Sequence, residues 1–175
     1  MKIFNLSFIN KNKKDKERLN KLRVLLSALY DTGYTKIRKT LFMKLIFLID
    51  YYLDEKLSRE PKVFGYNFYI YKYGVFTSKV LIDLENLNIS YEKNKDGVYI
   101  KIPVPSYDDR KLIEEYIELY NKFKKIIEKY VKPFEEDPDG LSNYILEKLL
   151  GVRPGQKIFY YYTNVEELIE ENHIS

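Results

Sequence analysis

Basic side chains recur through the first part of the chain at positions that could contact DNA. Lysine and arginine bind phosphate oxygens, and hydroxyl groups add hydrogen bonds to the same backbone. Tyrosines lie among them and could stack on bases, although packing in the core or at an interface suits an amphipathic ring better. We therefore expect a nucleic-acid-binding surface, whose candidate residues are Lys36, Arg38, Lys39, Lys72, Thr77, Ser78, Lys79, Lys93 and Lys95.

Charge is divided unevenly along the chain. Residues 1–76 carry a net charge of +9 and residues 77–175 a net charge of −5, which together give the +4 of the whole chain. Lysines and arginines are dense over residues 11–23, in the first half of a predicted helix, where they oppose the helix dipole. This asymmetry favours an anionic partner at the front half or head-to-tail association of copies; the alternative is that both faces are simply solvated.

Residues suited to catalysis are few. The only histidine, His173, lies next to the C-terminus, and the chain contains no cysteine. Histidine acid–base chemistry, thiolate catalysis and cysteine-bound metals therefore have little or no basis. The acidic residues 135–139 lack the alternate-position spacing of a calcium loop. We predict a protein that is not an enzyme, with no catalytic residue, no metal ligand and no cofactor.

The elements that would position the basic residues follow the order of a winged-helix domain. In that order the short helix would lie in the major groove and the hairpin, marked by Gly97 in its turn, would form the wing. Asp83, Glu85 and Asn86 are expected on the outer face of the short helix, where carboxylates would repel phosphates. The order begins with a helix over residues 15–31 and a second helix over 36–55. A strand over 66–73, ended by Gly74, then leads to a short helix over 78–87 and a hairpin over 89–102.

Residues 40–53 form the most apolar stretch of the chain. Only Lys44 and Asp50 carry charge there, so apolar side chains surround the expected helix on all sides. The stretch is shorter than the roughly 20 residues of a membrane-spanning helix. We therefore expect a central core helix in a cytoplasmic protein without a membrane segment or signal peptide. Asp50 is expected to pair with a lysine or to cap a buried donor.

The remaining segments add helices to this core. Residues 2–9 could form an edge strand or a docked tail. Ser106 and Asp109 form a capping box that opens a long helix to residue 132, whose apolar stripe could pack on the domain or form a homodimer. The overall expectation is an α+β, mainly helical chain with a winged-helix-like domain at 1–105 and an extension at 106–175. Besides the long helix, we expect in that extension an acidic turn over residues 135–140, a helix over 141–150, a strand over 157–162 and a last helix over 164–171.

Two of these segments resemble the SocA-like antitoxin family, also called the Panacea domain. In the core helix the similar residues are Thr40, Lys44, Leu45, Ile46, Phe47 and Asp50. In the segment before the short helix, Tyr73, Gly74 and Ser78 match, whereas Val75 stands where the family has proline. The resemblance covers roughly residues 15–103. It implies a small, mainly helical, non-enzymatic regulator that binds a toxin, and it supplies no catalytic residues.

Our leading interpretation is a DNA-binding transcriptional regulator that acts on double-stranded DNA. It depends on the element order and on the basic front half of the chain. The alternative is an antitoxin-like protein that binds and neutralises a toxin, and it depends on the resemblance. A homodimer through the helix at 107–132 is compatible with both interpretations.

Overall fold

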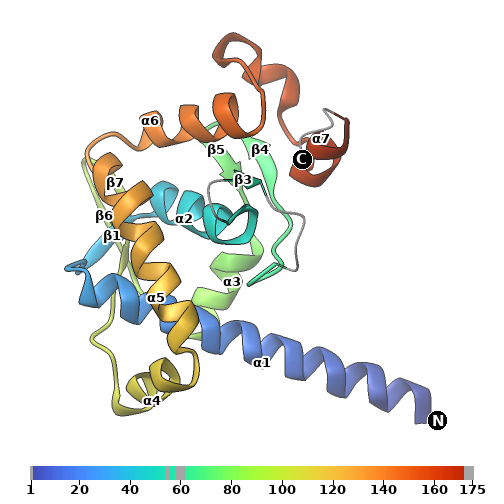
Figure 1. Cartoon of the computed structure of the whole chain (residues 1–175), viewed down its shortest axis with the longest axis vertical. Coiled ribbons are helices and arrows are strands. Elements are labelled where there is room, and N and C mark those ends of the chain that lie inside the picture. Colours follow the sequence, from blue (N-terminus) through green and yellow to red (C-terminus); the bar gives the residue numbers. More distant parts are fainter. Residues whose placement is uncertain (1, 54–55, 58–61, 172–175) are drawn as a thin grey trace.

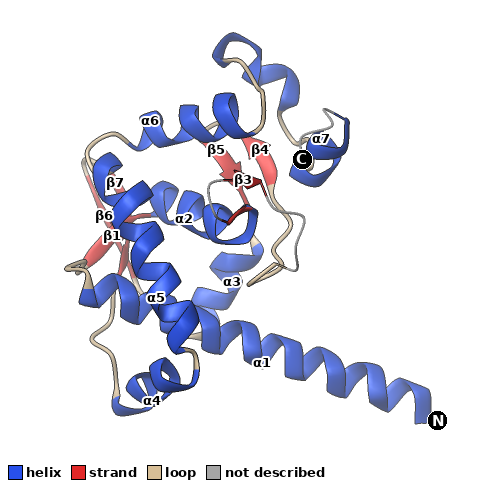
Figure 2. Ribbon diagram, in the orientation of Figure 1, coloured by secondary structure: helices blue, strands red, loops and turns tan. Residues whose placement is uncertain are grey.

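Helix α2 (Lys39–Tyr51) lies at the centre of the molecule, with the other helices and three small sheets arranged around it (Figure 1). The computed structural model describes residues 2–53, 56–57 and 62–171. Every side chain from Leu41 to Tyr51 is buried, including Lys44 and Asp50, as expected of a helix that is apolar all round. The described chain is α+β and mainly helical, as the sequence predicted (Figure 2).

Helix α1 (Lys2–Asp31) is longer than predicted, and the prediction of a strand or tail over residues 2–9 was wrong. No glycine or proline interrupts residues 2–31, so the helical period of the second half extends to the start. Its C-terminal half packs in the core, whereas its N-terminal half extends away from the body (Figure 1). The lysines at 11–16 therefore lie several turns inside the helix, and the expected opposition to the helix dipole does not arise.

The predicted helix over residues 36–55 is shorter at both ends. Lys36–Arg38 form strand β1, which pairs antiparallel with β7 (Gly97–Lys101), so Arg38 and not Thr35 precedes α2. This long-range pairing overrides the local helical pattern. After α2, β2 (Tyr52–Leu53) pairs with β3 (Lys56–Leu57). The predicted break at residues 58–61 lies outside the described residues.

The predicted hairpin and short helix are both confirmed. Strands β6 (Tyr91–Asn94) and β7 pair around a tight turn, and Gly97 adopts the positive φ of 138° that such a turn favours. Together with β1 they form a three-stranded antiparallel sheet in the order β1–β7–β6. Helix α3 (Lys79–Asn86) comes directly before this hairpin and buries Val80 and Leu84.

A second hairpin replaces the single strand predicted over residues 66–73. Strands β4 (Tyr69–Tyr71) and β5 (Gly74–Phe76) pair antiparallel, so Gly74 begins a strand and does not end one. Gly74 has a φ of 108°, and a side chain there would collide with Ser142. A residue without a Cβ is therefore required where the chain reverses.

The predicted long helix is divided at Tyr116. Its capping box is confirmed, because Ser106 and Asp109 bond each other's backbone N–H groups at the start of α4 (Tyr107–Glu115). A non-helical conformation at Tyr116 separates α4 from α5 (Ile117–Ile126), after which η1 (Ile127–Val131) and η2 (Lys132–Phe134) continue the chain. The apolar stripe packs on α1 and α2, as predicted, through Ile113, Phe123, Ile127 and Val131.

The C-terminal part agrees with the prediction in its helices but not in its strand. Helix α6 (Pro138–Asn143) starts inside the predicted acidic turn and continues as η3 (Tyr144–Leu149), and α7 (Val165–Glu171) is capped by Asn164. The predicted strand over 157–162 was wrong, because Pro154–Tyr160 form the 3₁₀ helix η4. The backbone of Tyr162 and Thr163 instead bonds Ile70 at the edge of β4. The domain boundary at residue 105 stays a prediction.

Candidate nucleic-acid interface

Asp83 points into the protein, and the expectation that it lies on the outer face of α3 was wrong. Its side chain is only 1% exposed. The guanidinium of Arg18 donates to both carboxylate oxygens, from Nε at 2.7 Å and from Nη2 at 3.0 Å, and the Tyr66 hydroxyl donates at 2.6 Å. The spacing of Val80, Asp83 and Leu84 on one helical face was the available signal for this placement.

The bonds to Asp83 connect α3 to α1. The carboxylate beside Arg18 holds the pKa of that guanidinium above its usual range, and burial beside Asp83 raises the pKa of the Tyr66 hydroxyl. Arg18 also lies 5.7 Å from the ring centroid of Tyr66 and donates to Asp15 at 2.8 Å. Arg18 therefore acts as a tether that fixes the position of α3 against α1.

The outer face of α3 is nearly neutral. It carries one cation, Lys79, and one carboxylate, Glu85. The exposed residues, counted from the one that precedes the helix, are Ser78, Lys79, Ile82, Glu85 and Asn86. Thr77, a predicted phosphate contact, is 3% exposed and does not reach the surface. Without Asp83, this face repels phosphates less than the sequence suggested.

A group of lysines on α1 lies beside this face. Cations on both helices lower the pKa of Asp15. The largest effect comes from its bond to Arg18, and Lys79 on α3 and Lys11 on α1 lower the pKa further. Lys11 and Lys14 are exposed and lie on the same helical face as Asp15 and Arg18, the face that contacts α3, and we call these two residues the α1 lysine group. The list of predicted site residues missed them, because no local pattern shows that α1 passes next to α3.

Two predicted residues on the β1–β7–β6 sheet, Lys36 and Arg38, contact residues of the β6–β7 hairpin. Lys36 forms an ion pair with Glu92 at 2.9 Å, which raises the pKa of Lys36 and lowers that of Glu92. Arg38 donates to the carbonyl of Asp96 at 2.6 Å. Both cations lie over the ring of Tyr99, 4.8 and 5.3 Å from its centroid. Part of their charge therefore serves to dock the hairpin on β1.

The other predicted residues lie at separate places. Lys93 and Lys95 are exposed on the β6–β7 hairpin, and Lys39 is half-buried at the start of α2. Lys72 is exposed in the turn between β4 and β5, where its carbonyl accepts a bond from Lys157. The predicted residues are therefore distributed over α3, the sheet, the start of α2 and this turn, and the structure does not gather them at one element.

The two charged side chains buried on α2, Asp50 and Lys44, bond to backbone groups of the chain. The Asp50 carboxylate accepts bonds from the backbone N–H groups of Phe64, Gly65 and Tyr66 at 2.8, 3.0 and 3.3 Å, which confirms its predicted role as a cap for buried donors. Burial raises its pKa to about 6, against the opposite effect of these bonds. Lys44 donates to the carbonyl of Thr40, and burial lowers the pKa of its ammonium group to about 8.

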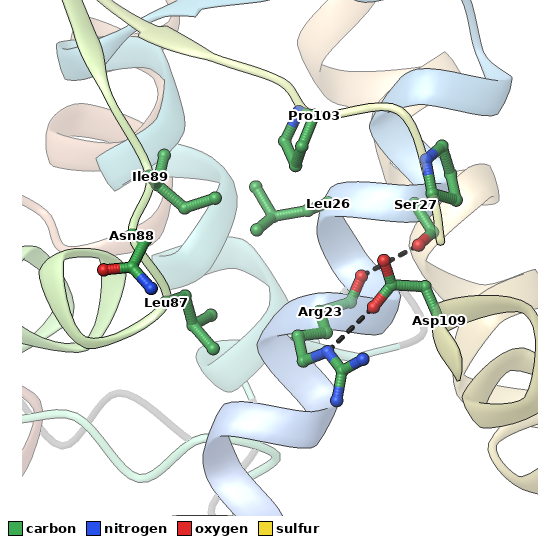
Figure 3. A pocket seen from close by; sticks show the side chains of 9 residues that line it. Arg23, Leu26, Ser27, Leu87, Asn88, Ile89, Pro103 and Asp109 are labelled. Carbon is green, nitrogen blue, oxygen red and sulfur yellow. Dashed lines mark hydrogen bonds and ion pairs between the residues drawn. The ribbon is translucent and has the colours of Figure 1, made fainter. Parts of the chain in front are cut away.

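A small hollow opens between α1 and the loop that leads to α4 (Figure 3). It measures about 200 Å³, and Leu26, Ile89 and Pro103 form much of its wall. Arg23 and Asp109 face each other across one side in an ion pair of 2.7 Å. The hollow is smaller than typical ligand pockets of about 300–1,000 Å³, and its charged groups already bind each other. We assign it no ligand.

No family model, no curated protein and no solved structure matches the chain. The resemblance to the SocA-like family therefore stays a prediction. Among the described residues, no group of three or more histidine, cysteine, aspartate or glutamate side chains is placed to hold a metal ion. No helix in the same part of the chain is both long and apolar enough to cross a membrane.

Proposed function

We propose that this protein is a regulator that binds double-stranded DNA through α3, the adjoining α1 lysine group and the β6–β7 hairpin. The observation that carries the proposal is the inward position of Asp83. Its bonds to Arg18 remove a carboxylate from the outer face of α3 and hold that face beside the lysines. The site is then a helix face of nearly zero net charge flanked by cations, which suits contact with base edges between two rows of phosphates.

The arrangement of elements supports a winged-helix-like core. Helix α3 leads directly into a hairpin, and the first strand β1 pairs with the second strand of that hairpin. In winged-helix proteins, as a class of DNA-binding motif, a helix enters the major groove and neighbouring elements contact the backbone. Lys93 and Lys95 on the hairpin are exposed and available for phosphates. Fold alone does not define function, so the proposal depends on the charges.

Reversing charge in the α1 lysine group and on α3 is expected to weaken DNA binding and reduce its salt dependence. We expect the triple variant Lys11→Glu, Lys14→Glu and Lys79→Glu to flatten the slope of log K against log salt by about 2 to 3, because each phosphate contact contributes about 0.9. Fluorescence anisotropy with a labelled duplex across a salt series measures the slope.

The matched control changes net charge equally at exposed lysines elsewhere. It is the triple variant Lys122→Glu, Lys125→Glu and Lys148→Glu, whose positions lie on α5 and η3. If binding were only a response to net charge, both triple variants would lose the same affinity. Equal losses, or wild-type protein that does not bind duplex DNA in a salt-dependent way at low ionic strength, would contradict the proposal.

The antitoxin-like alternative stays a prediction that depends on the resemblance. It is tested by expressing the neighbouring gene alone and together with this protein. A neighbour that is toxic alone and harmless in the pair would support it. A neighbour without toxicity, and no protein that co-purifies, would count against it.

A further inference from the structure

Ile82 is an exposed apolar side chain on the outer face of α3. It is 48% exposed, whereas Val80 and Leu84 of the same helix are fully buried and hold α3 on the core. Among the described residues, the side chains that pack against this core include Leu81 and Leu87 but not Ile82. The exposed surface of Ile82 therefore takes no part in docking α3 and is available to a partner.

Ile82 lies at the centre of the outer face. On the surface of an α-helix, the neighbours of a residue are those three and four positions before and after it. The other exposed residues occupy these four positions, and all of them are polar or charged: Ser78, Lys79, Glu85 and Asn86. Ser78 precedes the helix but has helical backbone angles, with φ −75° and ψ −26°, so it continues the same face. A ligand centred on this face contacts Ile82.

Both ends of this face adjoin elements that carry exposed lysines. At the N-terminal end, Lys79 lowers the pKa of Asp15, which places it beside the α1 lysine group. At the C-terminal end, burial and then the carboxylate of Glu85 raise the pKa of Tyr91 on β6, which places that end beside the β6–β7 hairpin and its lysines. Phosphates bound on the two sides leave Ile82 opposite the base edges between them.

The chemistry of an isoleucine side chain selects among the bases. In the major groove thymine presents a C5-methyl group, which apolar side chains contact, whereas the other base edges present hydrogen-bonding groups. An apolar side chain pressed against those groups would leave them without partners, at a cost in free energy. The polar residues around Ile82, which are Lys79, Glu85 and Asn86, are of types that bond to guanine, cytosine and adenine edges respectively.

We propose that Ile82 is a specificity-determining residue that contacts the methyl group of a thymine when α3 lies in the major groove. The DNA that this protein prefers then contains a thymine opposite the centre of α3. This inference rests on the proposed function and names the base that the same site reads.

Replacement of thymine by deoxyuracil tests the contact, because uracil keeps the hydrogen-bonding groups of thymine and lacks its methyl group. Selection from a pool of random duplexes with wild-type protein first identifies the preferred sequence. Each thymine in that sequence is then replaced singly, and fluorescence anisotropy at one fixed salt concentration measures the affinity. We expect one replacement to weaken wild-type binding about fourfold, which is the effect of leaving one methyl-sized group in water.

The variant Ile82→Ala connects this loss to the side chain. It should bind the thymine and uracil duplexes with equal affinity at the position that wild type distinguishes. Its salt dependence should stay that of wild type, because no phosphate contact is removed. The matched control is Ile117→Ala on α5, at a position that is 47% exposed, and it should keep the fourfold discrimination. Circular dichroism verifies that both variants are folded.

Three results would overturn the inference while leaving the proposed function in place. The first is salt-dependent binding of duplex DNA by wild-type protein with no sequence enriched in the selection. The second is a preferred sequence in which no uracil replacement weakens wild-type binding. The third is a loss that persists in Ile82→Ala, which would assign the methyl contact to another residue. Wild-type protein without salt-dependent binding would instead contradict the proposed function, and this inference with it.

Discussion

Replacing Asp83 with alanine is expected to lower the free energy of unfolding by about 3 to 5 kcal/mol, the usual cost of removing one partner of a buried ion pair. The substitution removes the two Asp83 oxygens that accept from Arg18, whose side chain is only 15% exposed, and leaves that guanidinium only its bond to Asp15. It also leaves the Tyr66 hydroxyl without its carboxylate. The cost comes from the unsatisfied guanidinium N–H groups more than from the lost attraction. Equilibrium unfolding in urea measures it.

Two comparisons separate this cause from a general effect on α3. Glu85→Ala changes an exposed carboxylate of the same helix and should shift stability by no more than about 0.5 kcal/mol. The double variant Arg18→Met with Asp83→Leu removes both charges and should be more stable than Asp83→Ala alone. If the double variant were as unstable as Asp83→Ala, the destabilisation would not come from leaving one charge of the pair without its partner.

Replacing Asp50 with alanine is expected to lower the free energy of unfolding by about 2 to 5 kcal/mol. The substitution leaves the N–H groups of two buried residues, Phe64 and Tyr66, without their acceptor, and each buried donor left unsatisfied costs about 1 to 3 kcal/mol. The N–H of Gly65, an exposed residue, loses the same acceptor but can bind water. Asp139→Ala, at an exposed aspartate, is the matched control. Urea unfolding of both variants provides the comparison, and equal stabilities would contradict the role of Asp50 as a buried cap.

The pH dependence of Asp50 has a defined sign. Its folded pKa of about 6 lies above the ordinary value of 3.8, so between these values the folded state binds more protons than the unfolded state. The contribution of this group to stability therefore falls as pH rises from about 4 to about 6, by up to about 3 kcal/mol, and then stays constant. The stability of wild type relative to Asp50→Asn should follow this course. A stability difference that increases with pH would show that the hydrogen bonds from the backbone N–H groups lower the pKa of Asp50 by more than burial raises it.

Residues close together in the sequence determined several features of this protein without help from the fold. Ser106 and Asp109 specify a capping box, and Gly97 specifies the tight hairpin turn, because the groups that bond are within a few residues of each other. The apolar residues of α2 predict a buried helix from composition alone. The sequence predicted that Asp50 would pair with a lysine or cap a buried donor, but it did not decide between the two or identify the amides that Asp50 caps.

The tertiary structure alone decided how distant segments meet, and this defines the candidate interface. Arg18 and Asp83 are 65 positions apart, and no local pattern links them. The same holds for the pairing of β1 with β7, which removes residues 36–38 from a predicted helix. Partners far apart in sequence are chosen by packing and charge in the folded chain. The bond between Asp83 and Arg18 and the place of the α1 lysine group beside α3 therefore appear only in three dimensions.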